Sequence, residues 1–384
     1  MKATYRVSPE VVAWVIKQIK TSDIPSISLD TTLKAWKTGE TIPTFDEIEH
    51  VSKKTHIPLG YFFLQRPPEE KIKLMKYRTV ASLGSGNPSR DLIDTIADME
   101  QIVDWTRDYL VSGGSEANTI VGKLKNETNV ETIAKDIRTT LGISEDWFKT
   151  IEDHFKYLRT RISEAGVIVM MNGVVRNNTR RPLDINEFRA FTLIDAYAPL
   201  IFINATDSPN GRIFSLLHEF THIYLGVDNL FNDRNGNNKG VSKLETICNA
   251  VAAEILVPSR LFGNIWDTMR SQSATLDVTI ARVAHVFKSG NVVIARKALD
   301  AGKLTQPLYD RIVHDAILGF NAQKQAQKGN GGNYYKTKGS RIDTRFFAFV
   351  IDSVAQGKTL YTEAFRLTDT NRTTFSKLVE GLHA

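Results

Sequence analysis

Residues 209–226 of the chain are PNGRIFSLLHEFTHIYLG, and no other stretch constrains the architecture as strongly. His218 and His222 are four residues apart, so on an α-helix their imidazoles share one face about a turn apart. In the pattern H-E-x-x-H, two imidazoles can hold one zinc ion while the intervening carboxylate, here Glu219, points to the same place. The pentapeptide therefore predicts a metal site of the kind found in zinc hydrolases.

The same stretch carries the start and stop signals of a helix. Asp207 or Ser208 can cap its N-terminus, Pro209 suits the first turn, and Gly226 can end it after Leu225. Apolar side chains recur at spacings of three and four and can form a buried stripe: Ile213, Phe214, Leu217, Phe220 and Tyr224. We expect a helix from Pro209 to Leu225.

A catalytic zinc takes three protein ligands, so a carboxylate should follow on a second helix. Residues 242–258, SKLETICNAVAAEILVP, predict that helix, and Glu245 is the best candidate ligand. Because Ser242-x-x-Glu245 is also a capping box, Glu245 could instead bond back to the Ser242 backbone. Glu254 is a competitor, but nine residues place it on the opposite helix face, so only one of the two carboxylates can face the metal.

Two neighbours of Glu245 could take part in the site. Asn249 follows it by one turn and could orient its carboxylate. Cys248 lies near the same face and could bind zinc as a thiolate, although a lone cysteine in an alanine-rich helix is typical of small buried packing.

HEFTHIYLG followed by ETICNAVAAEILVP resembles the ImmA/IrrE family of zinc metallo-endopeptidases, in which H-E-x-x-H precedes an E-x-x-x-N-x-x-A-A-x-x-L-x-P helix. Residues 179–204 resemble longer members that carry an N-terminal Xre-like DNA-binding module and also occur as antitoxins. The resemblance implies His218, His222 and Glu245 as zinc ligands and Glu219 as general base. It implies an endopeptidase in which Glu219 assists the attack of zinc-bound water on a protein regulator such as a DNA-bound repressor.

A second class of function stays open. The chain could be an antitoxin or regulatory binding protein that neutralises a partner toxin and binds DNA, with proteolysis conditional or absent. The sequence offers no clear oxyanion stabiliser, although Tyr197 or Arg212 could act.

The expected fold class is α+β, mostly helical, with a zincin-like core in which the H-E-x-x-H helix packs on a small sheet. Strand-like runs at 166–171, 191–195 and 199–204 predict that sheet. Residues 199–203 could be an edge strand that holds a substrate extended, or a strand that only buries the core. We expect residues 161–265 to form the peptidase core and 266–320 a helix-turn-helix-like element that completes it.

Residues 1–70 predict a helical module with helices at 8–20, 31–37 and 44–55, and residues 71–160 a helical linker region with helices at 91–111, 129–141 and 147–165. Residues 33–64 resemble the later helices of an Xre-type helix-turn-helix. Pro25 interrupts the segment where an intact motif has another helix, so the module is degenerate. It could bind DNA through a few exposed side chains, or serve protein contact instead. The candidate DNA-contacting residues are Thr31, Thr32, Lys34 and Lys37.

Residues 321–384 predict a basic, glycine-rich linker and a C-terminal helical segment over 345–383. No acidic residue occurs between Asp315 and Asp343, so the basic groups there could dock a partner, although a glycine tract is first a flexible linker. His285 is expected to be a core or surface histidine.

Composition is that of a cytoplasmic protein. Lysine and arginine number 49 against 43 acidic residues, a net charge of +6 that permits contact with nucleic acid without requiring it. A single cysteine allows no internal disulfide, and the apolar runs are too short to predict a membrane segment.

Overall fold

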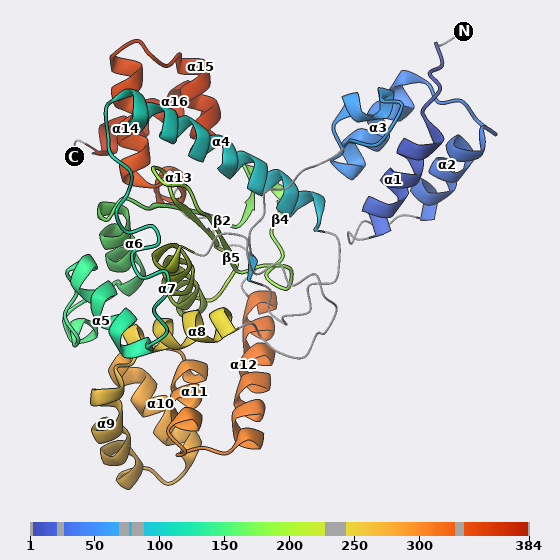
Figure 1. Ribbon diagram of the computed structural model, residues 1–384. Coiled ribbons are helices and arrows are strands. Elements are labelled where there is room, and N and C mark those ends of the chain that lie inside the picture. Colours follow the sequence, from blue (N-terminus) through green and yellow to red (C-terminus); the bar gives the residue numbers. More distant parts are fainter. Residues whose placement is uncertain are drawn as a thin grey trace. The chain divides into compact units, whose positions relative to one another are not determined.

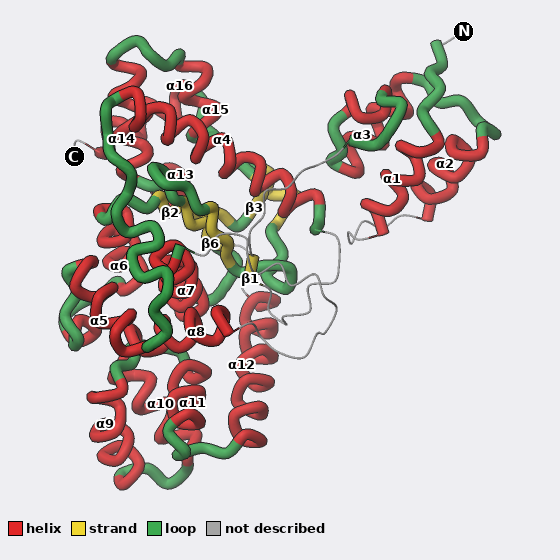
Figure 2. The backbone as a smooth tube through the Cα atoms, in the orientation of Figure 1, coloured by secondary structure: helices red, strands yellow, loops and turns green. Residues whose placement is uncertain are grey.

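The computed structural model describes residues 3–20, 27–68, 77–78, 88–226, 243–326 and 334–382. The chain divides into two compact units, one of Met1–Leu74 with Leu83–Asp98 and one of Met75–Ser82 with Met99–Ala384. The described residues are mostly helical with a small mixed sheet, which confirms the α+β class (Figures 1 and 2). None of the helices within these ranges is long and apolar enough to cross a membrane.

The first unit is a small helical module around one apolar core. It contains α1 (Pro9–Lys20), α2 (Ile27–Thr38), α3 (Phe45–Thr55), the 3-10 turn η1 (Leu59–Phe63) and the beginning of α4 (Arg90–Ser112). The predicted cap of α3 is present, because the Glu47 amide donates to Thr44 Oγ1 and the Thr44 amide donates to the Glu47 carboxylate at 2.7 Å. Helix α2 begins four residues earlier than predicted. Pro25 lies outside the described residues.

The second unit contains a four-stranded sheet in the order β1-β5-β6-β2. Its strands are β1 (Tyr77–Arg78), β2 (Ile168–Asn172), β5 (Ala190–Leu193) and β6 (Leu200–Asn204). Strands β2 and β6 are parallel and the other pairs are antiparallel. A separate hairpin consists of β3 (Val174–Val175) and β4 (Asn178–Pro182).

The prediction that residues 199–203 could form the edge strand is wrong. Strand β6 lies between β5 and β2, and all five of its residues are buried. The ends of the described sheet are β1 and β2. The alternative interpretation, a strand that buries the core, is the one that the structure confirms.

Four helices form a layer beside this sheet: α5 (Val130–Leu141), α6 (His154–Glu164), α7 (Pro209–Leu225) and α8 (Lys243–Leu256). Helix α7 packs on β5 and β6, α6 packs on α7 and β2, and α5 and α7 both pack on α8. The helix predicted over 147–165 is two elements, the 3-10 turn η2 (Trp147–Lys149) and α6. They are separated because the Asp153 side chain accepts from the Lys156 amide at 2.9 Å and starts α6 afresh.

The remaining helices form two groups. In Figure 1, one group lies at one end of this unit and the other at the opposite end, with α7 and α8 between them. The first group is α9 (Ser259–Ser271), α10 (Leu276–Phe287), α11 (Asn291–Asp300) and α12 (Gln306–Ala326); the second is α14 (Thr344–Ala355), α15 (Tyr361–Leu367) and α16 (Arg372–Leu382), preceded by α13 (Tyr334–Arg341). The segment predicted as one C-terminal helical stretch therefore contains three helices. Gly357 and Asp369, with φ of 71° and 49°, follow the first two. The predicted glycine tract at 329–332 lies outside the described residues.

A buried carboxylate ties the C-terminal group to the sheet. Asp343 caps α14 by accepting from the Phe346 amide at 3.0 Å, and it also accepts from Ser163 Oγ at 3.1 Å and the Val169 amide at 3.2 Å. The Arg159 guanidinium donates to the Val169 carbonyl at 2.7 and 3.1 Å. These two side chains satisfy main-chain groups of β2 that β6 does not use.

Candidate metal centre

Helix α7 has the bounds that its sequence predicts. Ser208 caps it by accepting from the Gly211 amide at 3.0 Å, Pro209 occupies the first turn, and Gly226 ends it with a φ of 55°. A Cβ atom at Gly226 would lie 2.4 Å from the Gly122 Cα, so this close approach excludes a side chain there. The Gly122 amide also donates to the Ile223 carbonyl at 2.9 Å. The helix therefore has a fixed end one turn after His222.

Three side chains from two helices converge beside α7. The Nε2 atoms of His218 and His222 are 3.1 Å apart. From α8, the Glu245 Oε2 atom is 3.2 Å from His218 Nε2, and its Oε1 atom is 3.2 Å from His222 Nε2. Both histidines are buried, and the Glu245 side chain is 27% exposed. The structure thus brings together the residues predicted as ligands; Ser242, the partner in the alternative capping box, lies outside the described residues.

The spacing of these donors fits a tetrahedral zinc. Two imidazole nitrogens and one carboxylate oxygen are among its usual ligands, and bonds of ~2.0–2.1 Å place tetrahedral donors about 3.3–3.4 Å apart. The donor atoms here are 3.1–3.2 Å apart, and those of the whole cluster lie within 4.8 Å of one another. The residues present therefore suit the ion that the H-E-x-x-H pattern predicts.

The electrostatics of the cluster favour a positive charge at its centre. Burial opposes a charged imidazole at His222, but contacts with Cys248 and Glu245 outweigh it and raise the pKa of His222 well above its ordinary value. Burial also opposes ionisation of Glu245, yet His218 and His222 hold the pKa of this carboxyl far below its usual range. A metal ion would supply the same positive charge.

Cys248 lies on the outer side of the cluster. Its Sγ atom is 3.6 Å from Nδ1 of His222, whereas the converging donor of that ring is Nε2. Burial raises the pKa of the thiol. Cys248 is thus placed to fix the orientation of the imidazole. This role differs from both interpretations that the sequence suggested, a zinc ligand and a small packing residue.

Glu219 lies between the two histidines in sequence, and its carboxylate is held by the sheet. Thr192 on β5 donates from Oγ1 to Glu219 Oε2 at 2.7 Å, and both residues are buried. The sequence does not single out Thr192, because a threonine in a short buried strand carries no signal beyond strand propensity.

Residues 167–299 match the family model Peptidase_M78, the IrrE N-terminal-like domain. This IrrE-like segment contains the sheet strands β2, β5 and β6, the helices α7 to α10, α11 except its last residue, and every residue of the cluster. The match supports the resemblance to the ImmA/IrrE family and indicates a protease-like, metal-dependent function. Residues 342–381 match a domain of unknown function, DUF8813. No curated protein and no solved structure matches the chain.

Within the IrrE-like segment, Glu254 has a structural environment away from the cluster. Its carboxylate accepts from the Ser259 amide at 2.9 Å and from Ser259 Oγ at 2.6 Å, and it forms an ion pair with Lys297. Glu254 therefore joins the start of α9 to α11. It lies away from the cluster, as its nine-residue distance from Glu245 predicts.

The other candidate residues of this segment lie as follows. Asn249 is half-buried one turn after Glu245. Tyr197 is half-buried in the loop before β6, where its amide donates to Asp195. Arg212 is in the first turn of α7 with its guanidinium over the Phe155 ring, 5.5 Å from the centroid, and burial lowers its pKa.

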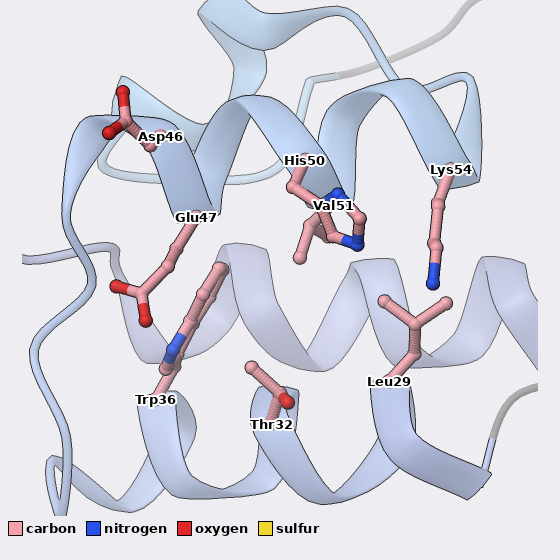
Figure 3. A pocket seen from close by; sticks show the side chains of 8 residues that line it. All are labelled: Leu29, Thr32, Trp36, Asp46, Glu47, His50, Val51 and Lys54. Atoms are coloured by element: carbon pink, nitrogen blue, oxygen red, sulfur yellow. The ribbon is translucent and has the colours of Figure 1, made fainter.

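Outside the IrrE-like segment, the candidate DNA-contacting residues lie on α2. Thr31, Thr32, Lys34 and Lys37 are exposed there. Lys34 forms an ion pair with Asp30 at 2.6 Å. Thr32 lines a groove of about 280 Å³ between α2 and α3, with Trp36 and His50 among its other walls (Figure 3). His285 is exposed on α10, as a surface histidine would be.

Proposed function

We propose that this protein is a zinc-dependent endopeptidase that cuts a protein regulator such as a DNA-bound repressor. The observation that carries the proposal is the convergence of His218, His222 and Glu245 within 4.8 Å, with Glu219 on the same helix as the histidines. Two neutral nitrogens and one carboxylate leave a fourth position open for water or substrate at a tetrahedral ion.

The residues of the site have two roles, binding the metal ion and transferring a proton. His218, His222 and Glu245 would hold the ion, with Cys248 against the far nitrogen of His222. A bound zinc supplies a Lewis acid that acidifies water and polarises the scissile carbonyl. Glu219 accepts a proton from the attacking water and passes it to the leaving amine. Thr192 donates to one oxygen of Glu219 and so restricts the rotation of the carboxylate that accepts this proton.

The choice of a protein regulator as substrate rests on the resemblance to the ImmA/IrrE family. The alternative function is an antitoxin or regulatory binding protein, in which the helical module of residues 1–70 binds DNA or a protein and cleavage contributes little. The two functions differ in their dependence on Glu219, since binding a toxin does not need a general base.

Glu219→Gln separates them. We expect the purified wild-type chain and the variant each to retain about one zinc per chain. New protein N-termini, identified by mass spectrometry in cells that express the wild type, should be absent with the variant. Identical sets of N-termini from two zinc-loaded chains, with toxin neutralisation preserved in the variant, would instead support the binding function.

A further inference from the structure

The outer edge of β5 presents two main-chain positions away from β6. The Asn204 amide donates to the Arg189 carbonyl at 2.9 Å, so the main-chain groups of Arg189 face β6. Because successive residues of an antiparallel strand face opposite neighbours, those of Phe191 also face β6, and those of Ala190 and Thr192 face outward.

This edge adjoins the candidate active site. Thr192 is the residue whose side chain donates to Glu219, and β5 packs on α7. An extended chain paired with the Thr192 main chain would therefore pass beside the general base. Main-chain pairing of this kind accepts many sequences, because the hydrogen bonds do not involve side chains.

A segment of the same chain already lies on this edge. Strand β1 pairs antiparallel with β5, with Tyr77 opposite Phe191 and Arg78 opposite Ala190. Since the main-chain groups of Ala190 face outward, Arg78 is the residue of β1 that exchanges hydrogen bonds with it. Strand β1 thus lies opposite Ala190 and Phe191, the two residues that directly precede Thr192 along β5.

We propose that β1 is an intramolecular competitor for the outer edge of β5, so that an extended protein substrate must displace it before reaching Glu219. The proposal rests on the proposed endopeptidase function and adds a means of regulating it. A tethered segment is present at an effective concentration of ~1 mM, so even a two-residue strand would weaken binding of a free extended chain.

The test uses full-length, zinc-loaded protein in a Glu219→Gln background, so that binding is measured without cleavage. Arg78→Pro removes the amide that faces Ala190, whereas the control Arg78→Ala removes the same side chain and keeps the amide. Two measurements follow: hydrogen–deuterium exchange of the Ala190 amide, and affinity for fluorescein-labelled β-casein, an unfolded protein, by fluorescence anisotropy. A thermal melt of each variant checks that it folds.

We expect Arg78→Pro to speed exchange at Ala190 and to tighten casein binding about threefold to tenfold, with Arg78→Ala behaving as the parent. Slow exchange that persists in Arg78→Pro, or an unprotected Ala190 amide in the parent, would show that β1 does not occupy the edge. Equal casein affinity of the three proteins, or binding by none, would overturn competition. The peptidase function is tested in a separate assay, which measures cleavage of casein by the chain with Glu219 intact. Absence of cleavage there would count against the peptidase function and not against competition by β1.

Discussion

Thr192 on β5 and Glu219 on α7 are joined by a buried hydrogen bond of 2.7 Å between the threonine Oγ1 and the glutamate Oε2. This contact links the sheet to the metal helix at the residue proposed as the general base. A threonine hydroxyl here has two consequences: it restricts the rotation of the carboxylate, and it supplies a hydrogen bond to a buried polar group.

Replacing Thr192 should therefore slow the reaction without removing the metal. We expect Thr192→Val to lower kcat about tenfold, equivalent to ~1.4 kcal/mol, while zinc content stays at about one per chain. Thr192→Ser keeps the hydroxyl and should restore most of the rate. Steady-state kinetics and metal analysis of the two variants check this, and a serine variant as slow as the valine variant would contradict it.

The two glutamates of α8 should respond in opposite ways to the same substitution. Glu245→Gln removes a candidate ligand at a partly exposed position, so zinc affinity should fall by more than the 10–100-fold that loss of an outer partner costs, and the metal-free fold should lose less stability than it loses in Glu254→Gln. Glu254→Gln breaks the buried pair with Lys297, so the free energy of unfolding should fall by about 3 kcal/mol.

Each variant is the control for the other. Zinc affinity and the free energy of unfolding are measured for both variants. We expect the large loss of zinc affinity in Glu245→Gln and the large loss of stability in Glu254→Gln. A Glu254→Gln chain that folds normally and loses zinc would reverse the assignment of the two carboxylates.

Cys248 should influence the metal through His222. Its Sγ atom is 3.6 Å from His222 Nδ1, and partners of this kind fix the ring of a metal-binding histidine. We expect Cys248→Ala to weaken zinc binding about tenfold while the ion remains four-coordinate by X-ray absorption. Loss of one sulfur ligand from the wild-type spectrum on this substitution would show that Cys248 binds the metal directly.

Zinc should stabilise the chain more at pH 8 than at pH 6. In the metal-free fold the pKa of His222 is raised above its unfolded value, so its pairing stabilises the fold at low pH and loses this contribution as the pH rises through the folded pKa. Zinc must displace that proton, so its apparent affinity rises with pH. The difference in Tm with and without zinc, measured from pH 6 to pH 8, should increase; a constant difference would mean that no proton leaves the site.

Local signals predicted the metal helix because each of them is short-ranged. Ser208, Pro209 and Gly226 define α7 within the helix itself, and the four-residue spacing fixes the relation of His218 to His222. Glu245 followed from the need for a third ligand and from the resemblance, since spacing alone did not separate it from a capping role.

Long-range pairing is what the sequence did not reveal. Residues 199–203 have the composition of a buried strand whether they lie inside a sheet or at its edge. Their position is decided by the two strands that pair with them, β5 and β2. The role of Thr192 could not be predicted for the same reason, because its partner Glu219 is 27 residues away on another element. The sequence does not reveal the gap between η2 and α6, because the apolar pattern continues across it. Only the Asp153 side chain, which caps α6, marks the new start.

Asp343 belongs to the DUF8813 match at 342–381, yet its carboxylate lies against Ser163 and the β2 main chain. Cutting the chain just before it would leave the Val169 amide without its acceptor and remove the cover from part of the sheet. The segments that match the two family models, 167–299 and 342–381, thus belong to one compact unit here. A shortened protein made for crystallisation or assay should therefore keep residues 334–382.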